Sequence, residues 1–281
     1  MTRAVRRCLR DPLTSVLGVV IVALGTAATT TLFAILHALV IAPLPFPEAR
    51  RLVVMMDRDR SGDLVGVTPG RYRDHRTRLA PLLALAAIRT GLSFNALDRS
   101  GALRVNGALA DRALFDVLGR PPALGRFFVD RDFDPDAAPV VILSHAIWKD
   151  HFLGDSSAVG RVLVLDGTPH EVVGVLPPDW TTPGGDCDVW LPLRLTVWNR
   201  VSRNLTLVGR LGRGVTLDQA AQSLAAEHAG LAAEYPDLDG AVAPVLQDLS
   251  ESLGGVARPV IVFVFVASIS LVCLIGLNLA T

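Results

Sequence analysis

Charged side chains are absent from two long stretches of this chain of 281 residues. No Asp, Glu, Lys or Arg lies between Asp11 and Glu48, and none lies from Pro259 to Thr281. A transmembrane helix needs roughly 20 apolar residues, and both stretches are long enough. The sequence therefore predicts two membrane spans, at residues 13–42 and 259–281, with the chain ending inside the second.

A cleaved signal peptide is the alternative for the first stretch, because arginines precede it. The apolar core of a signal is only about 7 to 15 residues long, so a span is favoured. Four arginines between residues 3 and 10 flank the stretch, and positive residues stay on the cytoplasmic side. We therefore expect a cytoplasmic segment at 1–12 and an extracytoplasmic domain at 43–258.

Cysteine is scarce, and its placement excludes a disulfide framework. Cys8 is expected in the cytoplasm and Cys273 in the second span, which leaves Cys187 alone in the outer domain. Burial must therefore stabilise this domain, and roughly 200 residues suffice for a core. The 27 basic and 27 acidic residues cancel, so nothing indicates nucleic-acid binding.

Motifs that carry chemistry are also missing. Ser144 and His145 are adjacent, but no G-x-S-x-G pattern accompanies them, and Ser144 is explained as a helix cap. "GRLGRG" at 209–214 lacks the G-x-x-x-x-G-K-[ST] pattern of a phosphate loop and is interpreted as strand end, turn and helix cap. We predict that the chain is not an enzyme and does not itself bind ATP.

Possible metal ligands do not form a recognised pattern. His145, His151 and His170 belong to no H-E-x-x-H motif and are interpreted as surface or hairpin residues. "GGDCD" at 184–188 could hold a cation weakly, but a solvated loop is favoured. We predict no catalytic, cofactor-binding or metal-binding residues.

The outer domain contains interleaved strand and helix signals. Strands are predicted at 52–56, 84–89, 92–97, 140–143, 205–211 and 241–246, with a hairpin around Asp166-Gly167. Helices are predicted after the caps Thr68, Ser144 and Thr216, and in "RALFDVLG" before Gly119. Because these signals follow no strict βαβ rhythm, the predicted class is α+β, a mixed α/β extracytoplasmic domain between two transmembrane helices.

Two features of the first apolar stretch indicate mechanical use. Small, hydroxyl-bearing residues at 25–31 predict packing against another helix, whereas a lone anchor would not need them. Pro43, Pro45 and Pro47 then fix φ and remove donors where the chain meets water. We predict a stiff, extended exit through which movement of the helix would move the domain.

Four segments, in this order, resemble the MacB-like periplasmic core domain of FtsX-like ABC transporter permeases, in particular the bacterial orphan permeases. They are "RRCLRDPLTSVLGVVIVALGTAATTTLFAILHALVIAPLPFPEARRLV", "FDVLGRPPALGRFF", "APVVILSHAIWKDHFLGDSSAVGRVLVLDGTPHEVVGVLP" and "DVWLPL". The resemblance implies an α/β periplasmic domain after the first span, further membrane helices, and a separate cytoplasmic ATPase. No catalytic residue is implied for the permease subunit.

The resemblance favours a permease subunit in a bacterial inner membrane, used for efflux or export, with its main domain in the periplasm. Its expected partners are a cytoplasmic ABC ATPase, a second copy or second permease unit, a periplasmic adaptor protein and membrane lipid. The chain stops where the family continues, so a truncated permease is expected. The alternative is a two-helix membrane sensor whose outer domain binds a ligand.

Overall fold

A computed structural model describes residues 44–98, 101–183 and 185–254, together with the short pieces 23, 25–31, 33–34 and 262–270. The chain divides into two compact units. The larger comprises Leu44–Leu253, and the smaller comprises Met1–Pro43 with Gly254–Thr281.

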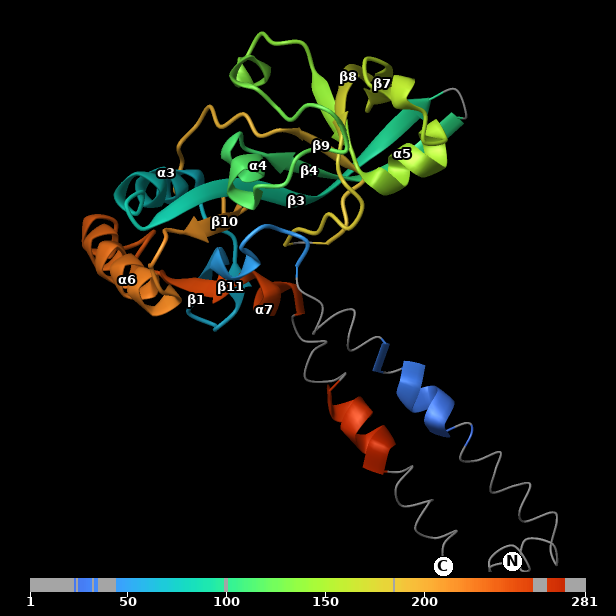
Figure 1. The fold of residues 1–281 in the computed structure, drawn as a ribbon. Helices are drawn as coiled ribbons and strands as arrows, with labels where there is room; N and C mark the ends of the chain where they lie inside the picture. Colours follow the sequence, from blue (N-terminus) through green and yellow to red (C-terminus); the bar gives the residue numbers. More distant parts are fainter. Residues whose placement is uncertain are drawn as a thin grey trace, which may run out of the picture. The chain divides into compact units, whose positions relative to one another are not determined.

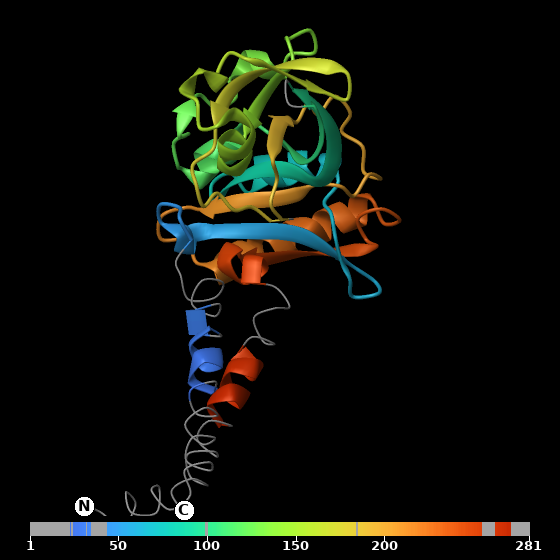
Figure 2. The same ribbon diagram turned by 90° about the vertical axis from the view of Figure 1, so that its right-hand side faces the viewer.

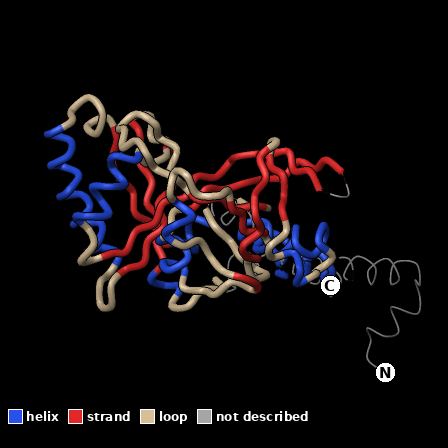
Figure 3. Tube along the Cα trace, turned by 90° about the horizontal axis from the view of Figure 1, so that it is seen from above, coloured by secondary structure: helices blue, strands red, loops and turns tan. Residues whose placement is uncertain are grey.

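One mixed sheet runs through the larger unit (Figures 1 and 3), and eleven strands of the described residues belong to it. Their order is β11-β1-β10-β3-β4-β9-β6-β8-β5, with β2 beside β1 and β7 beside β3 and β8. The strands are β1 Leu52–Asp59, β2 Leu64–Val65, β3 Leu83–Asp98, β4 Gly101–Ala110, β5 Leu124–Gly125, β6 Val140–Leu143, β7 Val162–Leu165, β8 Thr168–Val175, β9 Val189–Pro192, β10 Thr206–Leu211 and β11 Val242–Asp248. Two described pairs, β4 with β9 and β6 with β8, are parallel, and the predicted α+β class is confirmed.

Helices lie at the two ends of this sheet and over its middle. They are α3 Pro69–Arg78, α4 Ala113–Leu118, α5 His145–Phe152, α6 Leu217–Glu234 and α7 Leu249–Gly254, with 3₁₀ turns η2 Ala49–Arg51, η3 Asp130–Phe133 and η4 Ser156–Ala158. Figure 1 shows α3 and α6 at one end of the sheet and α5, with β7 and β8, at the other.

The predicted helix caps are confirmed. The Ser144 hydroxyl accepts a hydrogen bond from the Ile147 N–H at 3.2 Å. Thr216 and Gln219 form a reciprocal capping box, which satisfies two backbone donors at the start of α6. Thr68 likewise caps α3, whose first residue is Pro69.

The two short strands predicted at 84–89 and 92–97 are one strand, β3. Its pairing with β4 shifts between Arg89 and Leu92, where Gly91 has a φ of +75°. Such a bulge bends a strand without ending its ladder, so the two predicted strands are parts of one strand and Gly91 marks the bulge between them. The predicted hairpin is confirmed between β7 and β8, because Asp166 and Gly167 both adopt positive φ, as a type I′ turn requires.

The sheet is buried on both faces, which explains the unbroken apolar run at the start of β1. Leu52 and Val54 enter a central cluster, whereas Val53 and Met55 enter a cluster facing α3 and α6. The central cluster also contains Phe46, Phe115, Trp190 and Leu249. A third cluster, the α5 cluster, contains Val141, Leu143, Ile147, Leu163, Leu165, Val172 and Val189.

The predicted extended exit is wrong over the part of it that the structure describes. Residues 45–48 form bends and turns, and Glu48 has a φ of +46°. Phe46 is buried at 6% exposure in the central cluster, and burial of this aromatic ring turns the backbone back onto the domain. The segment is therefore fixed by packing, in addition to its prolines.

Most of the two predicted spans, 13–42 and 259–281, lies outside the described residues. Among the residues that are described, no helix is long and apolar enough to cross a membrane. The described pieces of the smaller unit are helical, and the hydroxyls of Thr29 and Ser268 are 2.9 Å apart. The rings of Phe33 and Phe265 lie 5.9 Å apart. Packing of the 25–31 stretch on another helix is confirmed at these contacts.

Candidate functional site

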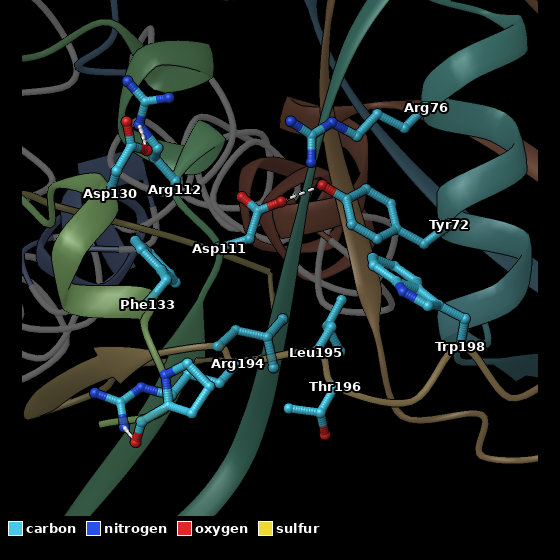
Figure 4. Close-up of a pocket in the computed structure, with 12 residues that line it drawn as sticks. Tyr72, Arg76, Asp111, Arg112, Asp130, Phe133, Arg194, Leu195, Thr196 and Trp198 are labelled. Carbon is cyan, nitrogen blue, oxygen red and sulfur yellow. Dashed lines mark hydrogen bonds and ion pairs between the residues drawn. The ribbon is translucent and has the colours of Figure 1, made fainter. Parts of the chain in front are cut away.

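A cleft of about 460 Å³ opens on the larger unit beside α3 (Figure 4). Its walls come from four segments that lie far apart in the sequence. Tyr72 and Arg76 project from α3, Asp111 and Arg112 follow β4, residues 130–135 form a third wall, and 193–198 form the fourth. The sheet and α3 thus hold groups that no local sequence pattern connects.

The polar centre of the cleft is the pair Tyr72 and Asp111. The Tyr72 hydroxyl donates to one carboxylate oxygen, and the Leu114 N–H donates to the other at 3.1 Å. Burial raises the pKa of Asp111, although these hydrogen bonds oppose the change. Burial and the neighbouring carboxylate also raise the pKa of Tyr72, so its hydroxyl is a hydrogen-bond donor and not a nucleophile.

Three arginines line the cleft, and they differ in the groups that they contact. Arg112 pairs with Asp130 at 2.9 Å, and both side chains are more than half exposed, so this pair is weak. Arg194 donates to the backbone oxygens of Asp132 and Ala137 at 3.0 and 3.3 Å. Among the described residues, neither Arg76 nor Arg194 has a carboxylate within ion-pair distance. The charge of Arg76 still acts on Asp111, where it partly opposes the rise in the pKa of that carboxyl.

Residues 193–199 form a strap between this cleft and a second one of about 210 Å³. The Leu193 N–H donates to the Ala110 oxygen, and the Gly70 N–H donates to the Asn199 oxygen, both at 2.8 Å. Between these anchors, Val197 is 64% exposed and Trp198 is 39% exposed. The strap is therefore fixed at both ends and presents apolar side chains to solvent.

Buried charges hold α3 in place from the side of β1. The Arg71 guanidinium lies 3.0 Å from Asp57 and 3.6 Å from Asp239, and all three side chains are fully buried. Arg203 contacts the second Asp57 oxygen at 3.0 Å, and Arg200 lies 2.5 Å from Asp239. Burial raises the pKa of Asp57, and the arginines oppose that change. A buried charge of this kind is tolerated only while its partners stay in place.

An aromatic chain connects the start of the domain with the cleft. The Phe46 ring is 5.4 Å from the Trp180 ring, which is 5.9 Å from Phe115. Phe115 lies 5.7 Å from Phe128, and Phe128 lies 6.0 Å from Phe133, a residue of the cleft wall. Consecutive rings in edge or tilted contact form one packed path.

The chain also leaves the domain beside the place where it enters. β11 pairs with β1 from Val53↔Asp248 to Asp59↔Val242 (Figure 2). Leu249 is fully buried in the central cluster, and Leu253 packs against that cluster, as does Leu44, where the chain enters the domain. One cluster therefore anchors both connections to the smaller unit.

The histidines singled out in the sequence are not brought together. The His145 ring packs on Trp148, and His170 is buried in the β7–β8 hairpin with Nδ1 2.9 Å from the Thr168 oxygen. Among the described residues, no group of three or more His, Cys, Asp or Glu side chains could hold a metal ion. The predicted lack of catalytic, cofactor and metal residues stays a prediction.

The other sequence motifs have structural roles. In "GRLGRG", β10 ends at Leu211 and Gly214 forms a turn with a φ of +79°, as interpreted from the sequence. In the 184–188 loop, Asp188 accepts the Asn106 N–H at 2.8 Å and so fixes β9 beside β4. Burial, followed by the neighbouring aspartates, raises the pKa of the Cys187 thiol to about 11.

Comparison with known proteins gives a consistent family match. A family model described as the MacB-like periplasmic core domain matches residues 15–227. The "Macrolide export ATP-binding/permease protein MacB" of Nitrosomonas europaea is 37% identical over 75 residues. That match spans 26% of this chain and only 11% of the relative's length.

Solved structures are similar in fold at 16% identity. The periplasmic region of MacB from Actinobacillus actinomycetemcomitans aligns with a TM-score of 0.52, over 71% of this chain and 89% of that one. The extracellular domain of the ABC-type transporter YknZ from Gram-positive bacteria gives 0.50, over 69% and 99%. A domain of a protein assigned as a permease from Porphyromonas gingivalis gives 0.54, over 72% and 92%.

Proposed function

Because the chain belongs to the MacB-like periplasmic core domain family, we propose that it is a membrane permease subunit of an ABC-transporter-type system for efflux or export. Residues 13–42 and 259–281 span a bacterial inner membrane, residues 1–12 lie in the cytoplasm, and residues 43–258 lie in the periplasm. A separate cytoplasmic ABC ATPase hydrolyses ATP. A second permease unit, which is a copy of this chain or a related one, and a periplasmic adaptor complete the assembly.

The domain's task in this proposal is to transmit conformational change across the membrane. The observation that carries it is the shared anchor of both connections. Phe46 and Leu249 are buried in one cluster, and β1 and β11 are bonded in register between them. Displacement of either connection therefore acts on the packed sheet as a whole, because close-packed cores transmit strain.

Contacts between the described helical pieces of the smaller unit support the same proposal. Thr29 and Ser268 join through their hydroxyls, and Phe33 packs near Phe265. In lipid, small and hydroxyl-bearing residues allow helices to approach closely and to hydrogen-bond. Two spans that are packed in this way would move together.

Transmission can be tested in the chain assembled with its ATPase, by loosening the anchor. Phe46→Ala removes the ring that contacts Trp180. We expect ATP hydrolysis by the complex to continue while export falls. The matched control is Phe152→Ala, which removes a partly buried ring from the separate α5 cluster and should leave export unchanged. Wild-type export by Phe46→Ala would exclude this role for the anchor.

Membrane placement has its own test. A reporter enzyme that is active only in the periplasm should be active when it is fused after Gly184 and inactive when it is fused at Arg10. The opposite pattern would reverse the proposed topology.

The cleft favours a second candidate, the two-helix sensor. A concave site lined by more arginines than carboxylates suits a ligand-binding outer domain, whereas a purely mechanical domain would not need such a site. The two candidates differ in the cytoplasm. Cross-linking from residues 1–12 should capture an ABC ATPase if the chain is a permease subunit and a signalling protein if it is a sensor.

A further inference from the structure

We propose that the cleft between α3 and the strap binds a small amphiphilic anion, a carboxylate carried on an apolar or aromatic body. This inference goes beyond the permease function and does not depend on it, because binding is a property of this chain alone. The cleft's volume of about 460 Å³ lies within the range of roughly 300–1,000 Å³ that small-molecule sites occupy.

The sign of the ligand's charge follows from the arginines. Arg76 is exposed at the cleft and, among the described residues, has no carboxylate within ion-pair distance. Arg194 donates to backbone oxygens and has no carboxylate within ion-pair distance among the described residues. A guanidinium binds a carboxylate through short, charge-assisted hydrogen bonds.

The acids of the cleft do not offer a matching site for a cation. Both oxygens of Asp111 are occupied, one by the Tyr72 hydroxyl and one by the Leu114 N–H. Asp130 lies at the exposed rim, 2.9 Å from Arg112. Three arginines, Arg76, Arg112 and Arg194, line the cleft against these two aspartates, so its net charge is positive, and a carboxylate complements it.

The apolar part of the ligand is specified by side chains on two of the walls. Phe133 comes from the 130–135 wall, and Leu193 and Leu195 come from the strap, where the Trp198 ring is 39% exposed and lies beside Tyr72 (Figure 4). The Thr196 hydroxyl, which has no partner among the described residues, supplies a neutral hydrogen-bonding group on the strap. A rigid aromatic or branched body would replace water on this surface.

The test uses the full chain in nanodiscs of zwitterionic lipid, with N-acetylphenylalanine as the probe and equilibrium dialysis as the measurement. Its amide, N-acetylphenylalaninamide, has nearly the same shape and no charge. We expect saturable binding of the acid and binding of the amide that is weaker by about tenfold, because a hydrogen bond to a charged group contributes that much. Equal binding of acid and amide, or no saturable binding of the acid, would overturn the proposal.

Variants locate the site. Arg76→Gln should weaken binding of the acid by about tenfold and leave binding of the amide unchanged. Arg78→Gln is the matched control, because Arg78 lies on the same helix and is half exposed but does not line the cleft. Thr196→Val on the strap should weaken binding of the acid by less than Arg76→Gln does. If Arg76→Gln bound the acid like the wild type, the arginine's role and the site would be wrong.

Discussion

The α3 end and the α5 end of the domain bury different kinds of side chain. At the α3 end, Arg71, Asp57 and Asp239 are fully buried and held by one another. At the α5 end, the cluster is apolar, and the nearby ion pair between Arg161 and Asp155 is half exposed. The same sheet thus continues from a region fixed by directional ion pairs into a region fixed by non-directional packing.

This difference matters because α3 carries part of the cleft. Apolar packing tolerates small shifts, whereas a buried guanidinium must meet its carboxylates at specific positions. Arg71 is next to Tyr72 in α3, so the ion pairs that hold Arg71 also set where Tyr72 reaches Asp111. The charged end therefore fixes the geometry of the cleft, whereas the apolar end contributes mainly to the stability of the fold.

The largest effect should come from breaking the buried network. Arg71→Leu leaves Asp57 and Asp239 buried without their shared partner. We expect the free energy of unfolding to fall by about 4 kcal/mol. Chemical denaturation of the full chain in detergent measures this. Arg203→Leu, whose side chain is 23% exposed, should cost less. Equal, small losses in both variants would mean that the network contributes little.

The cost of Arg71→Leu should also depend on pH. Burial raises the pKa of Asp57 already in the wild type. Without Arg71, the folded pKa rises further above the unfolded value, so protonation stabilises the folded state as pH falls through that pKa. The deficit of the variant should therefore shrink towards acid pH. A deficit that stays constant with pH would show that lost packing, and not an unpaired carboxylate, is its cause.

The apolar end should respond to truncation without this pH dependence. Leu165→Ala in the α5 cluster removes a side chain that is 2% exposed, and we expect a loss of about 3 kcal/mol. The loss should be the same at neutral and acid pH, because no titratable group changes its partner. Comparing the two variants across pH therefore distinguishes the two ends directly.

Local signals in the sequence predicted the elements well. Caps at Ser144 and Thr216, the Asp166-Gly167 turn and the apolar run at 52–56 each act within a few residues, and the structure confirms them. The division into two strands at 84–89 and 92–97 was wrong because pairing with β4 continues past Gly91. Tertiary pairing there joins two segments that the local sequence pattern separates.

The cleft could not have been predicted, because its residues meet only through the sheet order. Tyr72, Asp111 and Arg194 are far apart in sequence, and no spacing relates them. The run "RYRDHR" at 71–76 does not by itself reveal that Arg71 is buried while Arg76 is exposed. Which residues of the short helix α3 are buried depends on which of its faces packs against β1 and α6, and the local sequence does not show this.

A moderate effect is expected at the cap of the long helix in the charged end. Thr216→Ala removes the hydroxyl that accepts the Gln219 N–H and should cost about 1 kcal/mol of stability. Ser144→Ala at α5 is the matched change at the apolar end and should cost a similar amount. Thermal unfolding monitored by circular dichroism would detect either loss, and no change at both positions would contradict the role of the caps.

The smallest effect on stability should come from replacing either of two histidines, His170 at the α5 end and His228 at the α3 end. Burial lowers the pKa of His170, and the charge of Arg194 adds to this, against the Thr168 backbone bond. Burial also lowers the pKa of His228 beside Arg71.

A histidine whose folded pKa lies below its unfolded value, which is about 6.5, stabilises the fold fully above that value. As pH falls below the unfolded pKa, the unfolded chain takes up the proton first, and stability is lost until the folded pKa is passed. His170→Gln should therefore reduce the difference in unfolding free energy between about pH 7.5 and about pH 5.5. His228→Gln should reduce it separately, and the two reductions should add, because the residues belong to different packing clusters. If neither variant changed that difference, acid sensitivity would have to arise from the carboxylates, and the histidines would bind protons equally in the folded and unfolded states at these pH values.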